Sequence, residues 1–183
     1  MVILVLNCGS SSIKYQVIDM EAASSKVLAK GIVERIGLAE GDLVHKPVGK
    51  ERFELRQPIP DHTTGIRLVL DALTDPAHGV IRSLDEVKAV GHRVAHGGEF
   101  FPESCLVTEE VKEKIRSLFE IAPLHNPANL EGVLSIEKVL PGVPQVTVFD
   151  TSFHQTIPAV NYMYALPHAY YDKYRVRKYG FHG

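Results

Sequence analysis

The sequence has little of what would place a protein on nucleic acid or in a membrane. Its net charge is −2 over 183 residues, so it lacks the strongly basic surface that nucleic acid attracts. No apolar stretch approaches the roughly 20 residues that cross a bilayer. The apolar run 2–6 is too short for a signal peptide and follows no basic segment. We therefore expect neither a nucleic-acid partner nor a membrane.

Cysteine is also scarce, because Cys8 and Cys105 are the only two. Two cysteines do not make a disulfide framework, and a reducing cytoplasm is the simplest compartment for such a chain. Nine histidines are present, but none follows the His-Glu-x-x-His pattern of a metal site. We interpret Cys8 as a small filler within a polar turn. Hydrophobic residues make up 45% of the chain, which is enough for a sizeable core.

Hydrophobic periodicity predicts strands first and then helices that alternate with strands. The expected strands are 2–6, 12–19, 27–35, 52–57, 87–90 and 145–149. The expected helices are 64–73, 109–121, a third that begins after Asn126 as its cap and stops at Pro141, and 167–174. This order predicts an α/β domain, a mixed β-sheet with flanking helices.

The first two expected strands form a hairpin whose turn, 7–12, is small and polar. Gly9 lets a ligand approach the backbone, and Ser10 and Ser12 offer hydroxyl donors. Lys14 adds an ammonium group on the returning strand. Such a tip suits a polyphosphate, although a polar turn without any ligand fits the same residues.

Polar groups follow the apolar strands at three places: Asn7, Arg93 and Asp150. Ligands of open α/β sheets lie beyond the carboxyl ends of the strands, so these groups are expected to face one cleft. Arg93 offers a planar fork for a carboxylate or a phosphate. Asp150 could hold Mg²⁺ or orient an acceptor, or it could cap the next turn. His125, between two helices, either donates to an anion or holds its turn together.

Five segments carry a resemblance to a known family. They are Asn-Cys-Gly-Ser-Ser-Ser-Ile-Lys at 7–14, Gly-His-Arg-Val-Ala-His-Gly-Gly at 91–98, Ala-Pro-Leu-His-Asn-Pro at 122–127, Val-Phe-Asp-Thr-Ser-Phe-His-Gln at 148–155 and Tyr-Gly-Phe-His-Gly at 179–183. In this order they resemble the acetate kinase family of ATP-dependent kinases that phosphorylate short-chain carboxylates.

The resemblance implies an actin-like ATPase (ribonuclease H-like) fold with two related domains around a nucleotide cleft. Residues 1–150 would be the first domain, and 151–183 the start of the connection to a second one. It also implies the phosphorylation of acetate by ATP, giving acetyl phosphate and ADP, with Mg²⁺ as cofactor. For the family at full length it implies a homodimer.

The resemblance further implies roles for individual residues. Asn7 would lie at the Mg²⁺–phosphate end of the nucleotide. The ATP phosphates would be bound by Gly9, Ser10, Ser12 and Lys14. Catalysis would fall to Arg93, Asp150 and His182, with Asp150 orienting groups, since a carboxylate acceptor is already ionised at pH 7. The substrate would be bound by Arg93, Ala95, Leu124, His125 and Phe181.

Two departures from the family limit this expectation. Ala95 stands where a bulkier valine is usual, which widens the pocket and keeps propionate kinase as an alternative. Members of the family also carry a second half that these 183 residues lack, so we expect a truncated chain with impaired activity. A non-catalytic nucleotide- or phosphate-binding fragment is the other alternative.

Overall fold

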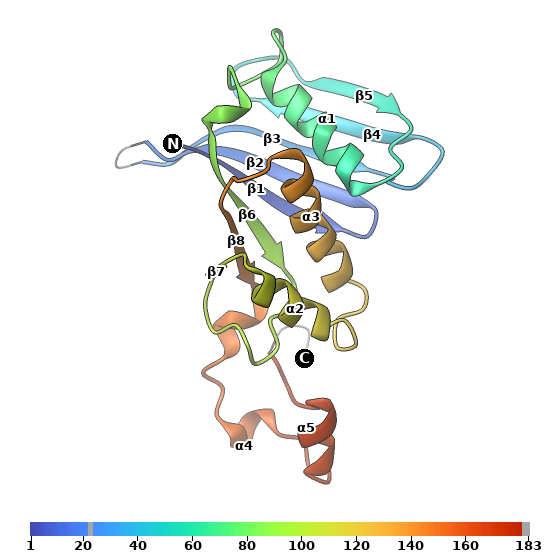
Figure 1. The fold of residues 1–183 in the computed structure, drawn as a ribbon, viewed down its shortest axis with the longest axis vertical. Helices are drawn as coiled ribbons and strands as arrows, with labels where there is room; N and C mark the ends of the chain where they lie inside the picture. Colours follow the sequence, from blue (N-terminus) through green and yellow to red (C-terminus); the bar gives the residue numbers. More distant parts are fainter. Residues whose placement is uncertain (22–23, 181–183) are drawn as a thin grey trace.

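The computed structural model describes residues 1–21 and 24–180, and it contains one eight-stranded mixed sheet (Figure 1). The strand order is β5-β4-β3-β2-β1-β6-β8-β7. Strands β1 to β5 form an antiparallel meander, whereas β6 runs parallel to both β1 and β8. The strands are β1 Val2–Gly9, β2 Ser12–Asp19, β3 Lys26–Glu34, β4 Gly41–Pro47, β5 Phe53–Gln57, β6 Val87–Val94, β7 Cys105–Leu106 and β8 Gln145–Phe149.

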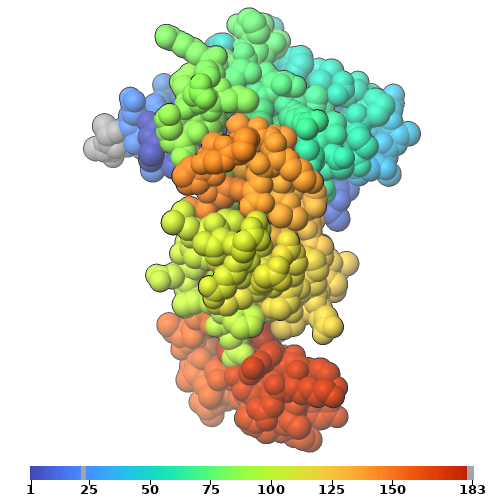
Figure 2. All heavy atoms as spheres, in the orientation of Figure 1, coloured from blue at the N-terminus to red at the C-terminus, as the bar shows by residue number. Residues whose placement is uncertain are grey.

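The three longest helices, α1 His62–Thr74, α2 Glu109–Ser117 and α3 Asn126–Val139, lie on the same face of the sheet (Figure 1). Two short helices, α4 Ala159–Tyr162 and α5 Ala169–Tyr174, follow β8 and form a projecting end of the molecule (Figure 2). Single 3₁₀ turns occupy Leu84–Glu86 and Asp150–His154. Among the helices of the described residues, none combines the length and apolarity needed to cross a bilayer.

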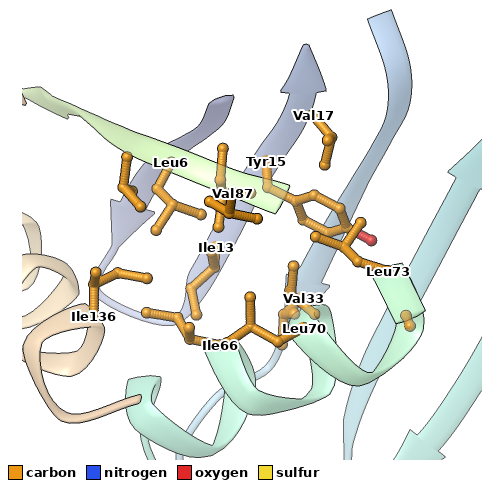
Figure 3. Packing of buried hydrophobic residues seen from close by; sticks show 14 of the residues in the cluster. Leu6, Ile13, Tyr15, Val17, Val33, Ile66, Leu70, Leu73, Val87 and Ile136 are labelled. Atoms are coloured by element: carbon orange, nitrogen blue, oxygen red, sulfur yellow. The ribbon is translucent and has the colours of Figure 1, made fainter. Parts of the chain in front are cut away.

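The main core lies between α1 and the first strands, and it follows from the alternation in the sequence. Ile13 and Tyr15 are buried on the helix side, whereas Lys14 between them is exposed on the other. Ile66 and Leu70 of α1 pack onto these strands (Figure 3). A second core joins α2, α3 and the end of β8, where the rings of Phe101 and Phe149 stack 4.1 Å apart.

The predicted mixed sheet with flanking helices is confirmed, but several boundaries were wrong. β1 extends to Gly9, because Asn7, Cys8 and Gly9 continue the ladder with β2, and only Ser10 and Ser11 form the turn. Cys8 is therefore a buried strand residue and not a filler of the turn. α2 ends four residues earlier than predicted, at Ser117.

Two strands and one helix cap were also missed. β4 was not predicted, because its buried positions include His45 and Pro47, which do not read as part of an apolar alternation. The two-residue β7 is too short to give a periodic signal. Asn126 is the first residue of α3 and not its cap; His125 precedes the helix without a side-chain capping bond.

Candidate functional site

The carboxyl ends of β1, β6 and β8 are neighbours in the sheet, and their polar groups meet there as predicted. Arg93 Nε donates to both carboxylate oxygens of Asp150, at 3.1 and 2.9 Å, and Arg93 Nη2 donates to Oδ2. Arg93 Nη1 donates to Asn7 Oδ1 at 3.3 Å. The ion pair is half-buried, with 34% of the arginine side chain and 22% of the aspartate side chain exposed. A guanidinium held by two partners in this way keeps a fixed direction.

Lys14 lies directly opposite Asn7 in the β1–β2 register, so both side chains leave the same face of the sheet. This face is the one that α1, α2 and α3 leave uncovered (Figure 1). Asn7 and Lys14 line a hollow of about 510 Å³ there, together with Lys30 and Lys46. The hollow thus presents three ammonium groups next to the Arg93–Asp150 pair, an arrangement that attracts a polyanion.

The tip of the hairpin is a two-residue turn of exposed serines. A Cβ atom on Gly9 would stand 3.3 Å from Ser12 Oγ, a tight contact, so glycine suits this position. Ser10 is exposed. Neither Ser10 nor Ser12 lines the hollow that contains Lys14, Lys30 and Lys46, which we call the lysine hollow. The role of Gly9, Ser10 and Ser12 in binding phosphate stays a prediction.

A second hollow, of about 540 Å³, contains part of the predicted substrate pocket. Ala95, Leu124 and His125 line it together with His96 and Tyr179. Arg93, predicted as a fourth substrate ligand, does not line this hollow and contacts Asn7 and Asp150 instead. The remaining predicted residues, Phe181 and His182, lie outside the described residues.

Two asparagines of α3, which the sequence reasoning did not assign to the site, hold the end of β6. Asn126 Oδ1 accepts from the His96 N–H at 3.1 Å, and its Nδ2 donates to the His96 carbonyl at 2.8 Å. Asn129 Oδ1 accepts from the Ala95 N–H at 2.9 Å, and its Nδ2 donates to the Cys8 carbonyl at 2.6 Å. The only signal in the sequence was their spacing of three, which places both side chains on one face of the helix.

His92, between the site and the core, is buried and neutral. Its Nε2–H donates to Gln145 Oε1 at 2.7 Å. Burial lowers the pKa of His92 to about 4, because charging the ring would cost its hydration. The neighbouring His96 has its pKa lowered by burial as well, and its ring packs edge-on against Tyr179 at 4.4 Å. Neither ring is set up to act as a cation at neutral pH.

The projecting segment after β8 is attached to the β6 end through Glu99. The carboxylate Oε1 of Glu99 accepts from the Tyr171 hydroxyl and from Arg177 Nη1, both at 2.8 Å. This hydrogen bond to Glu99 is the main reason that the pKa of Tyr171 is raised to about 12. Arg177 also lies 3.6 Å above the ring centre of Tyr162. The contacts fix the wall of the second hollow that Tyr179 and Arg177 supply.

The first site contains two groups with oxygen atoms of the kind that Mg²⁺ prefers, and both groups accept hydrogen bonds from Arg93. Within residues 1–21 and 24–180, no group of three or more histidine, cysteine or acidic side chains is placed to hold a metal ion. Asn7 Oδ1 and the Asp150 carboxylate are, however, hard oxygen donors at the site. Mg²⁺ is commonly bound by one or two such groups plus phosphate oxygens and water.

Comparison with known proteins decides the family. The sequence profile of the Acetokinase family matches residues 2–183. The chain belongs to the acetokinase family. An acetate kinase of Desulfitobacterium hafniense (strain DSM 10664 / DCB-2) is 55% identical over 183 residues, and one of Thermotoga maritima is 56% identical over 181 residues. These matches cover 100% and 99% of this chain, but only 45% and 44% of those proteins.

Solved structures give the same assignment for the fold. Porphyromonas gingivalis acetate kinase superposes with a TM-score of 0.93 at 48% identity, and a propionate kinase from Francisella tularensis with 0.88 at 37%. Each match covers the whole of this chain and 45% of the other. The acetokinase chain thus has the actin-like ATPase fold and spans less than half the length of these relatives.

Proposed function

We propose that this chain supplies the phosphate- and carboxylate-facing part of an acetate kinase, which transfers the terminal phosphoryl group of ATP to acetate. The observation that carries the proposal is the meeting of Asn7, Arg93 and Asp150 at three adjacent strand ends. Beside them lie the lysine hollow on the open face and the hollow that includes Ala95. The chain spans 45% of the length of the Desulfitobacterium hafniense acetate kinase, so the activity of the whole enzyme is part of the proposal.

Phosphoryl transfer needs positioning and positive charge more than covalent help from the protein. Lys14 would contact the ATP phosphates, and the Arg93 fork would bind the acetate carboxylate or the phosphoryl group in flight. Bound Mg²⁺ would neutralise phosphate charge, with Asn7 and Asp150 as its protein-side ligands. Asp150 would then orient Arg93 and the ion, because acetate is already ionised at neutral pH and needs no base.

Acetate is the proposed substrate, and propionate is the second candidate. The pocket wall at residue 95 is an alanine, a small side chain, and one solved relative is described as a propionate kinase. One methylene in an apolar pocket changes binding by only about 1–3 kcal/mol, so the two activities should overlap. Comparing kcat/KM for acetate, propionate and butyrate ranks the substrates.

Two measurements on the 183-residue chain test the proposal. Calorimetry with Mg·ATP should detect binding, and this binding should weaken when Lys14 is replaced by alanine. Lys173→Ala serves as a matched control, since Lys173 is an exposed lysine on α5, far from the hollow along the chain. Trapping acetyl phosphate with hydroxylamine should show slow turnover, because the 183 residues correspond to 45% of the length of the acetate kinase they match.

The outcomes separate the candidates. Binding of Mg·ATP without any transfer supports a non-catalytic nucleotide-binding part, and turnover as fast as that of a complete kinase contradicts the proposed impairment. Absence of both binding and transfer overturns the proposed function. A homodimer and a cytoplasmic location stay predictions that light scattering and cell fractionation can test.

A further inference from the structure

Asn129 forms hydrogen bonds to two separate parts of the candidate site. Its carboxamide oxygen accepts from the backbone of Ala95, which lines the second hollow, and its nitrogen donates to the backbone of Cys8, two residues before the hairpin turn. The side chain is 2% exposed, so water does not compete for either bond. One buried carboxamide therefore joins the β1 end to the β6 end.

Asn129 donates to the Cys8 carbonyl at a point where the pairing of β1 with β6 has already ended. The register of β1 with β6 extends only to Leu6 and His92, so the two strands have separated by the time the chain reaches Cys8. A buried carbonyl without a donor costs free energy, and the Asn129 amide removes that cost. Beyond the last register pair of β1 and β6, the Asn129 side chain thus links the hairpin to the β6 end.

The close packing of α3 against the Cys8 side chain of β1 makes this link stiff. Gly132, one turn after Asn129, lies so close to β1 that an added Cβ would stand 2.5 Å from Cys8 Sγ and 3.1 Å from Cys8 Cβ. Helix α1 also holds the hairpin, since His62 Nε2 donates to the Gly9 carbonyl at 2.7 Å. The hairpin therefore has little freedom to move independently of α3.

We propose that Asn129 is a positioning residue that couples the hairpin to the second hollow. The nucleotide at the hairpin and the carboxylate in the hollow would then each be bound more tightly when the other is present. The inference rests on the proposed function for the identity of the two ligands. Asn126 provides the contrast: it makes two bonds of the same kind, but both go to His96, so it holds only the β6 end. Coupling by binding is reciprocal, so the factor is the same whichever ligand is added first.

Substitution with aspartate separates the two bonds of Asn129. In its ionised form, the carboxylate of Asn129→Asp still accepts from the Ala95 N–H but has no proton to donate to the Cys8 carbonyl. Amide hydrogen exchange, resolved by NMR without any ligand, should then accelerate about threefold to tenfold in residues 8–13 and stay slow at Ala95. In the matched control Asn126→Asp, residues 8–13 should exchange as in the unmodified chain.

A third variant keeps the carboxamide and moves the helix. Gly132→Ala should push α3 away from Cys8 and accelerate exchange both in residues 8–13 and at Ala95. If exchange in residues 8–13 is the same in the unmodified chain, Asn129→Asp and Gly132→Ala, the link does not hold the hairpin and the inference is overturned. This result does not depend on whether the chain binds a nucleotide.

Ligand binding then tests the coupling itself. The dissociation constant for acetate is measured with and without saturating Mg·ADP, which avoids turnover. The ratio should exceed about three in the unmodified chain and in Asn126→Asp, and should fall to one in Asn129→Asp. A ratio that is unchanged in Asn129→Asp, despite faster exchange of the hairpin, would leave Asn129 a purely structural residue. If the unmodified chain binds neither ligand, the proposed function fails and the exchange data alone decide the link.

Discussion

Acid should destabilise this protein through His92, the buried histidine of the segment that also carries Arg93. The ring donates from Nε2 to Gln145, and Nδ1 faces the helix at Gly132, 3.9 Å from where a Cβ on that glycine would stand. Protonation would place a charge where water does not reach, and the pKa of His92 is accordingly lowered from 6.5 to about 4. The folded state thus resists a proton that the unfolded state accepts.

The direction and the size of the pH effect on stability follow from this difference in the pKa of His92. The pKa of His92 is lower in the folded state than in the unfolded state. The free energy of unfolding is therefore highest above pH 6.5 and decreases as the pH falls from 6.5 toward 4. At about 1.4 kcal/mol per pH unit, this shift in pKa lowers the free energy of unfolding by roughly 3 kcal/mol. This is a large part of the stability of an ordinary domain, about 5–15 kcal/mol.

The assay is urea unfolding followed by circular dichroism at several pH values between 7.5 and 4. His92→Gln removes the titrating ring, so its free energy of unfolding should fall by roughly 3 kcal/mol less over this range than that of the unmodified chain. His168→Gln, which removes an exposed histidine of the projecting segment, is the control and should follow the unmodified chain. Parallel pH profiles for His92→Gln and the unmodified chain would refute the reasoning.

Three further substitutions have defined outcomes. Tyr15→Phe should lower the melting temperature by about 4–8 °C, because it leaves buried His45 Nδ1 without its donor at 2.7 Å, and calorimetry at pH 8 that finds no change would count against the bond. Gly31→Ala should cost about 2–3 kcal/mol in urea unfolding, because its Cβ would overlap the Tyr15 hydroxyl and the Val44 carbonyl; a variant as stable as the parent would contradict this packing. Arg93→Lys should weaken binding of acetate or Mg·ADP at least about tenfold, because lysine lacks the planar guanidinium group. The free energy of unfolding should change by less than about 1 kcal/mol, because the ion pair with Asp150 is partly exposed. Calorimetry measures the affinity and thermal melts the stability, and an unchanged affinity would show that Arg93 is not part of the site.

The parts of the fold that the sequence predicted are those set by local periodicity. The alternation around Ile13 and Tyr15 and the apolar stripe of α1 were read correctly, because burial on one face leaves a direct pattern in the chain. β4 was missed because His45 is buried through its bonds to Tyr15 and to the His78 carbonyl, which lie far away in the sequence. No window of neighbouring residues contains that information.

In the candidate site, too, some features could be predicted from the sequence and others depend on contacts between residues that are far apart in the chain. Strand ends that carry Asn7, Arg93 and Asp150 could be predicted to meet, because parallel neighbouring strands bring their carboxyl ends to one edge. The pairing of Arg93 with Asp150, and not with the hollow that includes Ala95, depends on side-chain directions that spacing does not give. Asn126 was interpreted as a helix cap because asparagine is common there, whereas a contact 30 residues away determines its orientation.

Helix α3 contributes to both hydrophobic cores of the molecule. Ile136, toward its carboxyl end, packs in the cluster beneath β1 to β4, whereas Leu130 and Val133 pack in the cluster around Phe149. Neither cluster can lose its packing while the helix stays in place for the other. The sheet and its three long helices should therefore melt in one cooperative step, with the van't Hoff enthalpy equal to the calorimetric enthalpy.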